Sequence, residues 1–517
     1  YKLESMQIFQ RFAAHPIQRQ LTRSLVIALT TAGLLLSPTG TIVAQTGLPN
    51  LGDDTQMSLG AERRFGDQIG REIYRDPDYV ADPVLDAYIT KLWLPLVNAS
   101  KRRGELSPEM SQQFAWKLFL IRDKSINAFA LPGGYFGVHM GLIGMVDSPD
   151  ELASVLAHEL THVTQRHIAR GMSKQSAQGP LMVAGILIGL LAMRTNPQAA
   201  SAAIASSQAG AIQSQLNFSR DMEREADRIG FTLMEPAGYA PIGFVSMFNK
   251  LARASQLSDS GNFPYLRSHP LTSERIADMS NRVQGLQDKT PLSTNTLHRL
   301  MSARARVLAD LSIDALKQHV ARAQNVNNPA QAKPSQDVLL GTLYAGTLAA
   351  WQQKDLATAH SLYSQLLQAT KGSLSPLESN QAIRWLGAEI QLPIALDMNS
   401  DARPEVFLAL EQKLAAKPSA DELSTMAGRL QNWLSLRSKD AEAWGLLSRV
   451  RLAQGQPVRA LMAEAEQQSA WLDESAALAR YQAAQDQIRR GAAFDTIDAA
   501  IIDSKVRELQ TKIREKN

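Results

Sequence analysis

The chain has 517 residues, of which 44% are hydrophobic, and this supplies enough apolar sequence for the cores of two or three domains. Its formal net charge is +4, but residues 1–44 hold four Lys or Arg and one Asp or Glu, so +3 of that charge belongs to the N-terminal segment. The remainder is close to neutral, which argues against a nucleic-acid partner. The sequence has no Cys, which excludes disulfides and thiolate metal ligands.

Residues 1–44 have the pattern of a secretory signal peptide. Arg19 and Arg23 precede an apolar run over 25–36, and Ile42-Val43-Ala44 supplies a small-residue cleavage site. The run is too short for a comfortable membrane span. We therefore expect a secreted protein that is cleaved near Ala44, and the alternative is an uncleaved N-terminal anchor.

Two strands are expected in the region that follows. The segment 114–121 alternates in places and is rich in Phe, Trp, Leu and Ile, and the segment 134–140 comes directly after a Pro-Gly-Gly turn. A strand at the edge of such a sheet can pair with an extended substrate backbone and bind it with little sequence preference.

A helix is predicted over 149–170. Ser148-Pro149-Asp150-Glu151 is a capping box with Pro at the first helical position, and Gly171 follows as a C-cap. This helix contains the stretch His158-Glu159-Leu160-Thr161-His162, an HExxH motif.

The HExxH motif indicates a zinc peptidase. Two His four residues apart project from one face of a helix and can bind a single metal ion, while Glu159 can reach a water on that metal without being a ligand. Neutral imidazoles with a carboxylate and one open position are what a catalytic Zn²⁺ requires. The alternative is that His158 and His162 are buried core histidines whose hydrogen bonds are satisfied.

The third ligand is expected from a second helix that runs to about Met234. A metzincin would need Gly and His where this chain has Gln165 and Ile168, and His167 falls well off the ligand face. Glu223 and Asp227 instead form another i, i+4 pair. Glu223 can complete a His₂Glu site and Asp227 can hydrogen-bond the distal nitrogen of a ligand His, whereas Glu225 points off that face. The alternative is an ordinary solvated charged face.

Several motifs in order resemble one gluzincin family, the HtpX-type and CAAX-prenyl-type peptidases, and within it the BepA-type periplasmic members with C-terminal TPR repeats. The residues that carry this resemblance are the segment 127–134, HExxH, Ser219-Arg220, the ExEAD run at 223–227, and His269-Pro270 with Arg275. It covers about residues 50–285 closely and the remainder more loosely. The resemblance implies that Gly134, Tyr135 and Phe136 bind substrate, with Asn127 near the cleft.

His269 and Arg275 are the candidates for stabilising the charge that develops on the scissile carbonyl oxygen, and a loop histidine and a structural ion pair are their alternatives. His269 lies on a Pro-flanked segment, so we also expect it to act as a latch. A neutral imidazole in the fourth zinc position would displace the catalytic water and close the site.

Another apolar stretch, 181–193, lies between the two metal-binding helices. It is too short to span a bilayer, so a flap over the cleft is expected, and a membrane-surface contact is the alternative.

Past about residue 290 the sequence predicts helices rich in Ala, Leu and Gln. Trp444, Leu447, Gly455 and Ala460 fall on TPR positions, with Pro457 starting the second helix of the pair, and Ala359 and Tyr363 match the second helix of an earlier repeat. We expect about four helical hairpins in a solenoid whose concave face is available to a partner. An anonymous helical domain is the alternative.

Together the sequence predicts a mainly α (α+β) fold in three parts: a signal peptide at 1–44, a zinc metallopeptidase domain with a small sheet at 45–290, and a TPR-like domain at 291–517. The resemblance implies a periplasmic endopeptidase that degrades misassembled outer-membrane proteins, with partners in the outer-membrane assembly machinery. The alternative is a chaperone-like TPR adaptor in which proteolysis is secondary.

Overall fold

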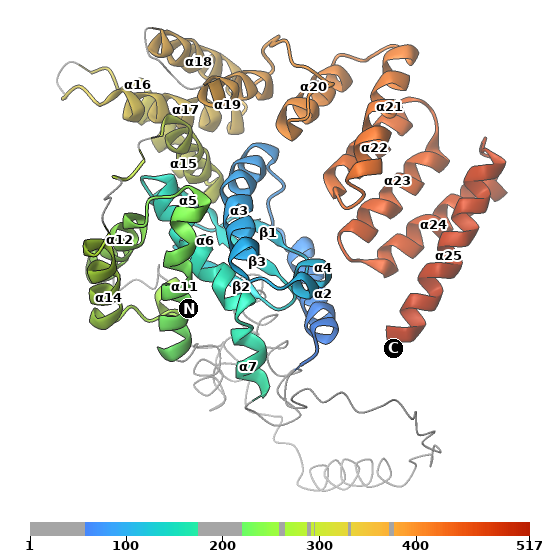
Figure 1. Ribbon diagram of the computed structural model, residues 1–517. Helices are drawn as coiled ribbons and strands as arrows, with labels where there is room; N and C mark the ends of the chain where they lie inside the picture. Colours follow the sequence, from blue (N-terminus) through green and yellow to red (C-terminus); the bar gives the residue numbers. More distant parts are fainter. Residues whose placement is uncertain are drawn as a thin grey trace, which may run out of the picture. The chain divides into compact units, whose positions relative to one another are not determined.

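The computed structural model describes residues 57–173, 220–257, 264–286, 291–293, 295–328, 332–371 and 377–516 (Figure 1). The predicted signal peptide and the apolar stretch 181–193 lie outside these residues. Most of the described chain is helical and its strands are short, so the prediction of a mainly α fold is confirmed.

The helices and strands up to residue 284 follow in chain order. They are α2 (Leu59–Arg75), α3 (Pro83–Arg103), α4 (Pro108–Gln113), β1 (Lys117–Ile121), β2 (Ala128–Leu131), β3 (Tyr135–His139), α5 (Met140–Met145), α6 (Pro149–Thr164), α7 (His167–Ser173), α11 (Arg220–Met234), the 3₁₀ turn η1 (Glu235–Ala237), α12 (Ile242–Leu257), α13 (Pro264–Ser268) and α14 (Ser273–Gln284).

In the described residues, three strands form one sheet in the order β1-β3-β2. β1 runs parallel to β3, and β2 and β3 form an antiparallel pair across the Pro-Gly-Gly turn. β1 and β3 match the two strands expected from the sequence, whereas β2 was not predicted. The four residues of β2 are too few to show a clear alternation in the sequence.

Both faces of the sheet are covered, because side chains alternate along each strand. On β1, Phe119 and Ile121 pack with residues of α2, while Leu118 and Leu120 belong to the large core that contains α3 and α6. In the same core, the ring of Phe136 on β3 lies 4.5 Å from that of Trp93 on α3. The sheet is therefore a buried layer between helices.

The close packing of α11 against α6 sets the distance between the two i, i+4 pairs that the sequence singles out, His158/His162 and Glu223/Asp227. A Cβ added to Gly230 on α11 would lie 3.1 Å from the backbone of Ala157 and of His158 on α6. A larger residue here would push the helices apart. At the start of α6, the hydroxyl of Ser148 accepts the N–H of Glu151, as the sequence predicts.

The helix expected over 149–170 is in fact two helices, α6 and α7, and this prediction is corrected. Arg166 has a φ of +52°, a left-handed conformation that ends α6 and redirects the chain. The Arg166 side chain is held in place by Glu62 on α2, with Nε 3.1 Å from Oε2, and by the backbone oxygen of Met57. Gly171 consequently lies inside α7 and is not a cap.

The helices of the C-terminal half pack mainly on their neighbours in sequence (Figure 1). They are α15 (Thr296–Ala309), α16 (Ile313–Gln324), α17 (Gln336–Gln352), α18 (Leu356–Thr370), α19 (Leu377–Glu389), α20 (Arg403–Ala415), α21 (Ala420–Leu436), α22 (Ala441–Ala453), α23 (Pro457–Ala470), α24 (Glu474–Arg489) and α25 (Thr496–Lys516).

Four of the positions assigned to TPR repeats are buried, whereas Trp444 is half-buried and Gly455 is exposed. Leu447 on α22, Ala460 on α23, and Ala359 and Tyr363 on α18 are all buried, and Pro457 is the first residue of α23. The TPR assignment itself stays a prediction.

The hydrophobic core does not stop at residue 290. One continuous cluster of buried residues extends from Val84 on α3 to Ile390 after α19, and separate clusters follow in the later helices. α15 packs directly on α5, so the first helices after residue 290 share the core of the peptidase region. None of the described helices has both the length and the apolar character needed to cross a membrane.

Candidate metal centre

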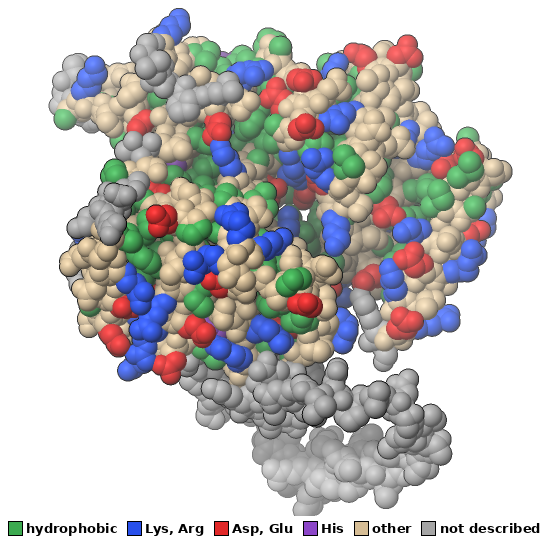
Figure 2. Space-filling model, viewed as in Figure 1, with side chains coloured by type: hydrophobic (Ala, Val, Ile, Leu, Met, Phe, Trp, Pro, Cys, Tyr) green, Lys and Arg blue, Asp and Glu red, His purple; other side chains and the backbone are tan. Residues whose placement is uncertain are grey.

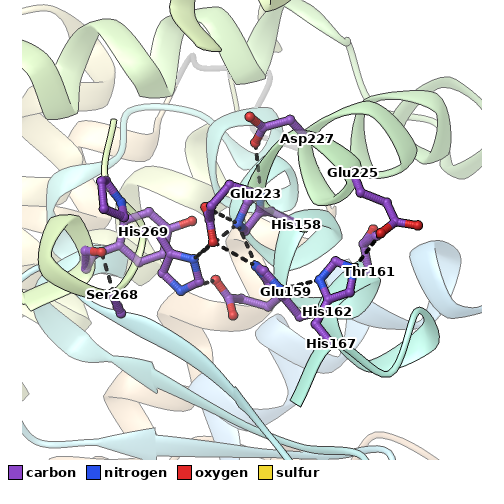
Figure 3. Close-up of polar contacts among 12 residues, drawn as sticks. His158, Glu159, Thr161, His162, His167, Glu223, Glu225, Asp227, Ser268 and His269 are labelled. Atoms are coloured by element: carbon purple, nitrogen blue, oxygen red, sulfur yellow. Dashed lines mark hydrogen bonds and ion pairs between the residues drawn. The ribbon is translucent and has the colours of Figure 1, made fainter. Parts of the chain in front are cut away.

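Four buried side chains from three segments converge at one point of the fold (Figure 3). His158 and His162 come from α6, Glu223 from α11, and His269 from the residue after α13. One ligand atom of each lies within 4.8 Å of the others. The structure thus brings together all four residues that the sequence predicts as metal ligands.

The geometry of the first three residues suits a cation. Nε2 of His158 lies 3.0 Å from Nε2 of His162, and the Glu223 carboxylate lies 3.5 Å from both nitrogens. Two ring nitrogens that face each other with lone pairs repel unless a positive charge lies between them. The donor set of two imidazoles and one carboxylate therefore fits a metal ion.

Asp227 and Arg275 brace this set from behind. The Nδ1–H of His158 donates to Asp227 Oδ1 at 3.0 Å, which leaves Nε2 to face the cluster. Arg275 contacts Asp227 with Nε at 2.6 Å from Oδ2 and NH2 at 2.8 Å from Oδ1, and its NH1 lies 2.9 Å from Glu223 Oε2. The predicted contact between Asp227 and a ligand histidine is present.

The charges of the cluster are strongly coupled. Burial favours neutral His158, but Asp227 and Glu223 outweigh it and raise the pKa of His158 to about 9. Burial would also raise the pKa of Glu223, yet the nearby His269 and His158 hold it well below its usual range. Glu223 is therefore ionised, and its negative charge favours the binding of a cation.

Glu159 differs from its neighbours. Neither of its carboxylate oxygens has a well-aligned hydrogen bond among the described residues, the Ala130 N–H lies near enough to lower its pKa, and His269 Nε2 lies 3.5 Å from Oε1. Burial raises the pKa of Glu159. A buried carboxylate with open acceptor sites and a raised pKa is a suitable proton acceptor.

His162 also has a partner behind it, which the sequence did not predict. Its Nδ1 lies 2.8 Å from Nδ1 of His167, and Nε2 of His167 lies 3.0 Å from Glu225 Oε2 (Figure 3). This corrects the expectations that His167 is remote from the ligands and that Glu225 is uninvolved. Gln165 and Arg166 are ordinary helix formers, so the local sequence does not predict the break between α6 and α7 that directs His167 towards His162.

His269 is fixed by local packing. Its backbone N–H donates to Tyr265 O at 2.8 Å, and the ring of Tyr265 stacks on its imidazole at 4.7 Å. Nδ1 of His269 lies 3.0 Å from Glu223 Oε1 and 3.3 Å from His158 Nε2. Residues 258–263, which precede α13, lie outside the described residues.

The predicted substrate-binding residues at the start of β3 do not lie on an open strand edge. β3 is the central strand, paired with β1 on one side and β2 on the other, so its backbone has no open edge. Gly134 O accepts the N–H of Lys117, Tyr135 OH donates to Asp67, and Phe136 packs against Trp93. This corrects the expectation that these residues offer an open strand edge to substrate, while substrate binding by Gly134, Tyr135 and Phe136 stays a prediction.

β2 is the strand of this sheet that faces the site. The bond from His139 N to Asn127 O makes 127 and 139 a hydrogen-bonded pair, so by alternation the N–H groups of Ala128 and Ala130 point away from β3. The Ala130 N–H is close enough to Glu159 to lower its pKa. Asn127 precedes this strand, and its buried side-chain oxygen has no hydrogen-bond partner among the described residues.

A helix that carries HExxH, a second helix that carries a buried glutamate, and a strand edge beside the carboxylate of Glu159 are typical of a metallopeptidase. The family model described as Peptidase family M48 matches residues 101–283. The chain is a metalloendopeptidase whose residues 101–283 match this family, and members of the family depend on a metal ion. The prediction of the enzyme class is confirmed.

The full chain is similar to proteins named beta-barrel assembly-enhancing protease. It is 28% identical to the Escherichia coli K12 protein over 520 residues, which cover 96% of this chain and 99% of that protein. It is 29% identical to the Yersinia pestis protein, covering 83% of this chain and 85% of the relative. It is also 28% identical over 190 residues to mitochondrial metalloendopeptidase OMA1 of Arabidopsis thaliana, covering 37% of this chain and 36% of that protein.

Proposed function

We propose that this chain is a zinc-dependent endopeptidase of the bacterial periplasm that acts on misassembled β-barrel proteins of the outer membrane. The observation that carries the proposal is the buried set of His158, His162 and Glu223 beside Glu159. The names of the relatives that match nearly the whole chain support the client class. The signal-peptide pattern of residues 1–44 supports the location.

Zinc is the metal that this donor set favours. Two imidazoles and one carboxylate with a further position in reach are typical of a catalytic Zn²⁺ site. The ion would supply Lewis-acid polarisation of the scissile carbonyl and of a water molecule.

The residues around it would carry the proton transfers and hold the substrate. Glu159 accepts the proton of the attacking water and passes it to the leaving amine. The outward N–H and C=O groups of Ala128 and Ala130 bind an extended substrate backbone, which gives affinity with little sequence preference. We assign Arg275 to positioning Asp227 and Glu223, because its guanidinium already contacts both carboxylates and Pro270 O.

His269 serves as a latch in the resting enzyme. Its Nδ1 already belongs to the four-residue set, and a fourth protein ligand would close the site as in a structural zinc centre. On opening, the same ring becomes the donor to the carbonyl oxygen. His269→Ala should therefore raise basal cleavage and self-degradation. Weak catalysis without self-degradation would instead favour the donor role alone.

The C-terminal helices select clients and partners, including the outer-membrane assembly machinery. A cavity of about 720 Å³ lies between the start of α3 and the C-terminal helices, and its charged lining includes Asp82, Arg403 and Glu442. Figure 2 shows Lys, Arg, Asp and Glu side chains around a hollow near the middle of the face that it draws. The proposed three parts meet near residues 44 and 290, and the hydrophobic core continues across residue 290.

The decisive experiment measures zinc content and cleavage of an unfolded test protein for wild type and Glu159→Gln. Wild type should bind one Zn²⁺ per chain and cleave, and the variant should keep the zinc and lose cleavage. A wild-type chain without zinc contradicts the proposal. If Glu159→Gln supports outer-membrane assembly in cells as well as wild type, the chaperone-like adaptor becomes the better assignment.

A further inference from the structure

The end of α6 places a second histidine against a ligand histidine. In a continuous helix, a residue five positions after His162 would point to another side. The left-handed Arg166 starts a new helix at His167, and this brings the two Nδ1 atoms to 2.8 Å. His167 is fully buried, so the contact is shielded from solvent.

The hydrogen bonds fix the direction of this contact. Glu225 Oε2 can only accept, so His167 donates to it from Nε2 at 3.0 Å. In a neutral ring the remaining nitrogen, Nδ1, is then an acceptor, and the donor must be the Nδ1–H of His162. His162 in that tautomer presents the lone pair of Nε2 to His158 and Glu223.

The two ligand histidines are therefore braced in parallel ways. His158 donates to Asp227, whose partner is Arg275, and both are buried. His162 donates to His167, which donates to Glu225, and Glu225 accepts in turn from Arg170 NH2 at 2.7 Å. Glu225 and Asp227 both lie on α11, so one helix supplies a ligand and the anchors of both histidines.

We propose that His167 and Glu225 are positioning residues that hold His162 in the tautomer and orientation needed to bind the metal ion. This inference rests on the proposed function of the site. Partners of this kind that orient a metal-ligating histidine are typically worth 10–100-fold in metal affinity.

The test measures the dissociation constant for Zn²⁺ on the full chain by competition with a chromophoric chelator. His167→Phe keeps a buried aromatic ring but removes both nitrogens, and Glu225→Ala removes the final acceptor. Each should weaken Zn²⁺ binding by about 10–100-fold. Glu225→Gln should restore most of the affinity, because the bonds from His167 and Arg170 both end on one oxygen, which the amide can replace.

Two controls separate positioning from general stability. Asp221→Ala removes a carboxylate from the same helix whose side chain is 86% exposed, and it should leave the Zn²⁺ affinity unchanged. The double variant His167→Phe/Glu225→Ala should lose no more than His167→Phe alone, because Glu225 acts through His167. Two independent structural contacts would give additive losses.

Wild-type affinity in His167→Phe, or additive losses in the double variant, overturns the inference. The same holds if Glu225→Gln is as weak as Glu225→Ala. If the wild-type chain itself binds no Zn²⁺, the proposed function fails first, and the two failures are thus distinguishable.

Discussion

Two buried groups of charges in this protein differ in how completely they are paired. At the junction of α3, α15 and α19, Arg304 is almost fully buried, and its guanidinium contacts Asp82 at 2.6 Å and Glu389 at 2.8 Å. At the metal centre, Glu159 is equally buried but neither of its oxygens has a well-aligned hydrogen bond among the described residues. The charge of Arg304 is paired with two carboxylates, whereas the carboxylate of Glu159 lacks a hydrogen-bonded partner in the described part of the chain.

This difference separates structural from functional charge. Burying an ion pair stabilises little, but removing one partner leaves an uncompensated charge that is costly. The Arg304 group therefore acts as a clamp between the peptidase region and the helices after residue 290, and Asp82 also caps α3 by accepting the N–H of Leu85 at 2.7 Å. In the proposed mechanism, the open acceptor sites of Glu159 would receive the proton of the attacking water.

The largest expected effect is on catalysis, and it tests whether Glu159 is a functional charge. Glu159→Gln should lower the cleavage rate of an unfolded protein by about 10²–10⁴-fold, since the amide cannot accept a proton. The variant's midpoint of thermal unfolding should not fall, because burial already disfavours the charged form of Glu159. Calorimetry and a cleavage assay on the same sample test both statements. A large loss of stability would place Glu159 with the structural charges.

Removing the clamp should give the opposite pattern. Arg304→Ala leaves the buried Asp82 and the partly buried Glu389 without a counter-charge, so the free energy of unfolding should fall by about 3–5 kcal/mol. The zinc content of the folded fraction should not change. Arg299→Ala, which removes a half-exposed pair with Asp147, is the matched control and should cost less than about 1 kcal/mol. Equal losses for the two variants would contradict the distinction.

Acidification should weaken the same junction. His298 on α15 donates to Val146 O at 3.0 Å and accepts from Tyr88 OH at 2.5 Å, and burial lowers its pKa to about 4. The unfolded chain, with a pKa near 6.5, takes up a proton first, so stability is lost as pH falls from about 6.5 to about 4. This amounts to about 3 kcal/mol at most.

His298→Gln separates this contribution from other titrations, because the amide can still donate to Val146 O but does not ionise. The stability advantage of wild type over the variant should shrink as pH falls from 7 to 4.5 in denaturant titrations. Parallel pH curves for the two proteins would show that His298 is not the responsible group.

The smallest effect concerns the residue behind His158. Asp227→Ala should weaken Zn²⁺ binding by about 10–100-fold, and Glu223→Ala should weaken it by more, since it removes a ligand. Asp221→Ala on the same helix is the control. Negligible losses for both Glu223→Ala and Asp227→Ala would mean that the metal lies elsewhere.

The sequence alone determined the parts of the site that depend on helical spacing. His158 and His162, and likewise Glu223 and Asp227, are four residues apart, and a helix places such pairs on one face whatever surrounds it. The start of α6 and the first residue of α23 were also predictable, because Ser148, Pro149 and Pro457 act on their own helix termini.

Only the tertiary structure decided the contacts that depend on distant segments. Arg166 ends α6 in a left-handed conformation because Glu62, 104 residues earlier, holds its side chain, and this turns His167 towards His162. β3 is the central strand because β2 pairs with it on the side away from β1, and β2 is too short to be predicted from the sequence. The core continues past residue 290 because α15 covers α5. Local patterns record what a segment does by itself, whereas these features arise from which surfaces meet.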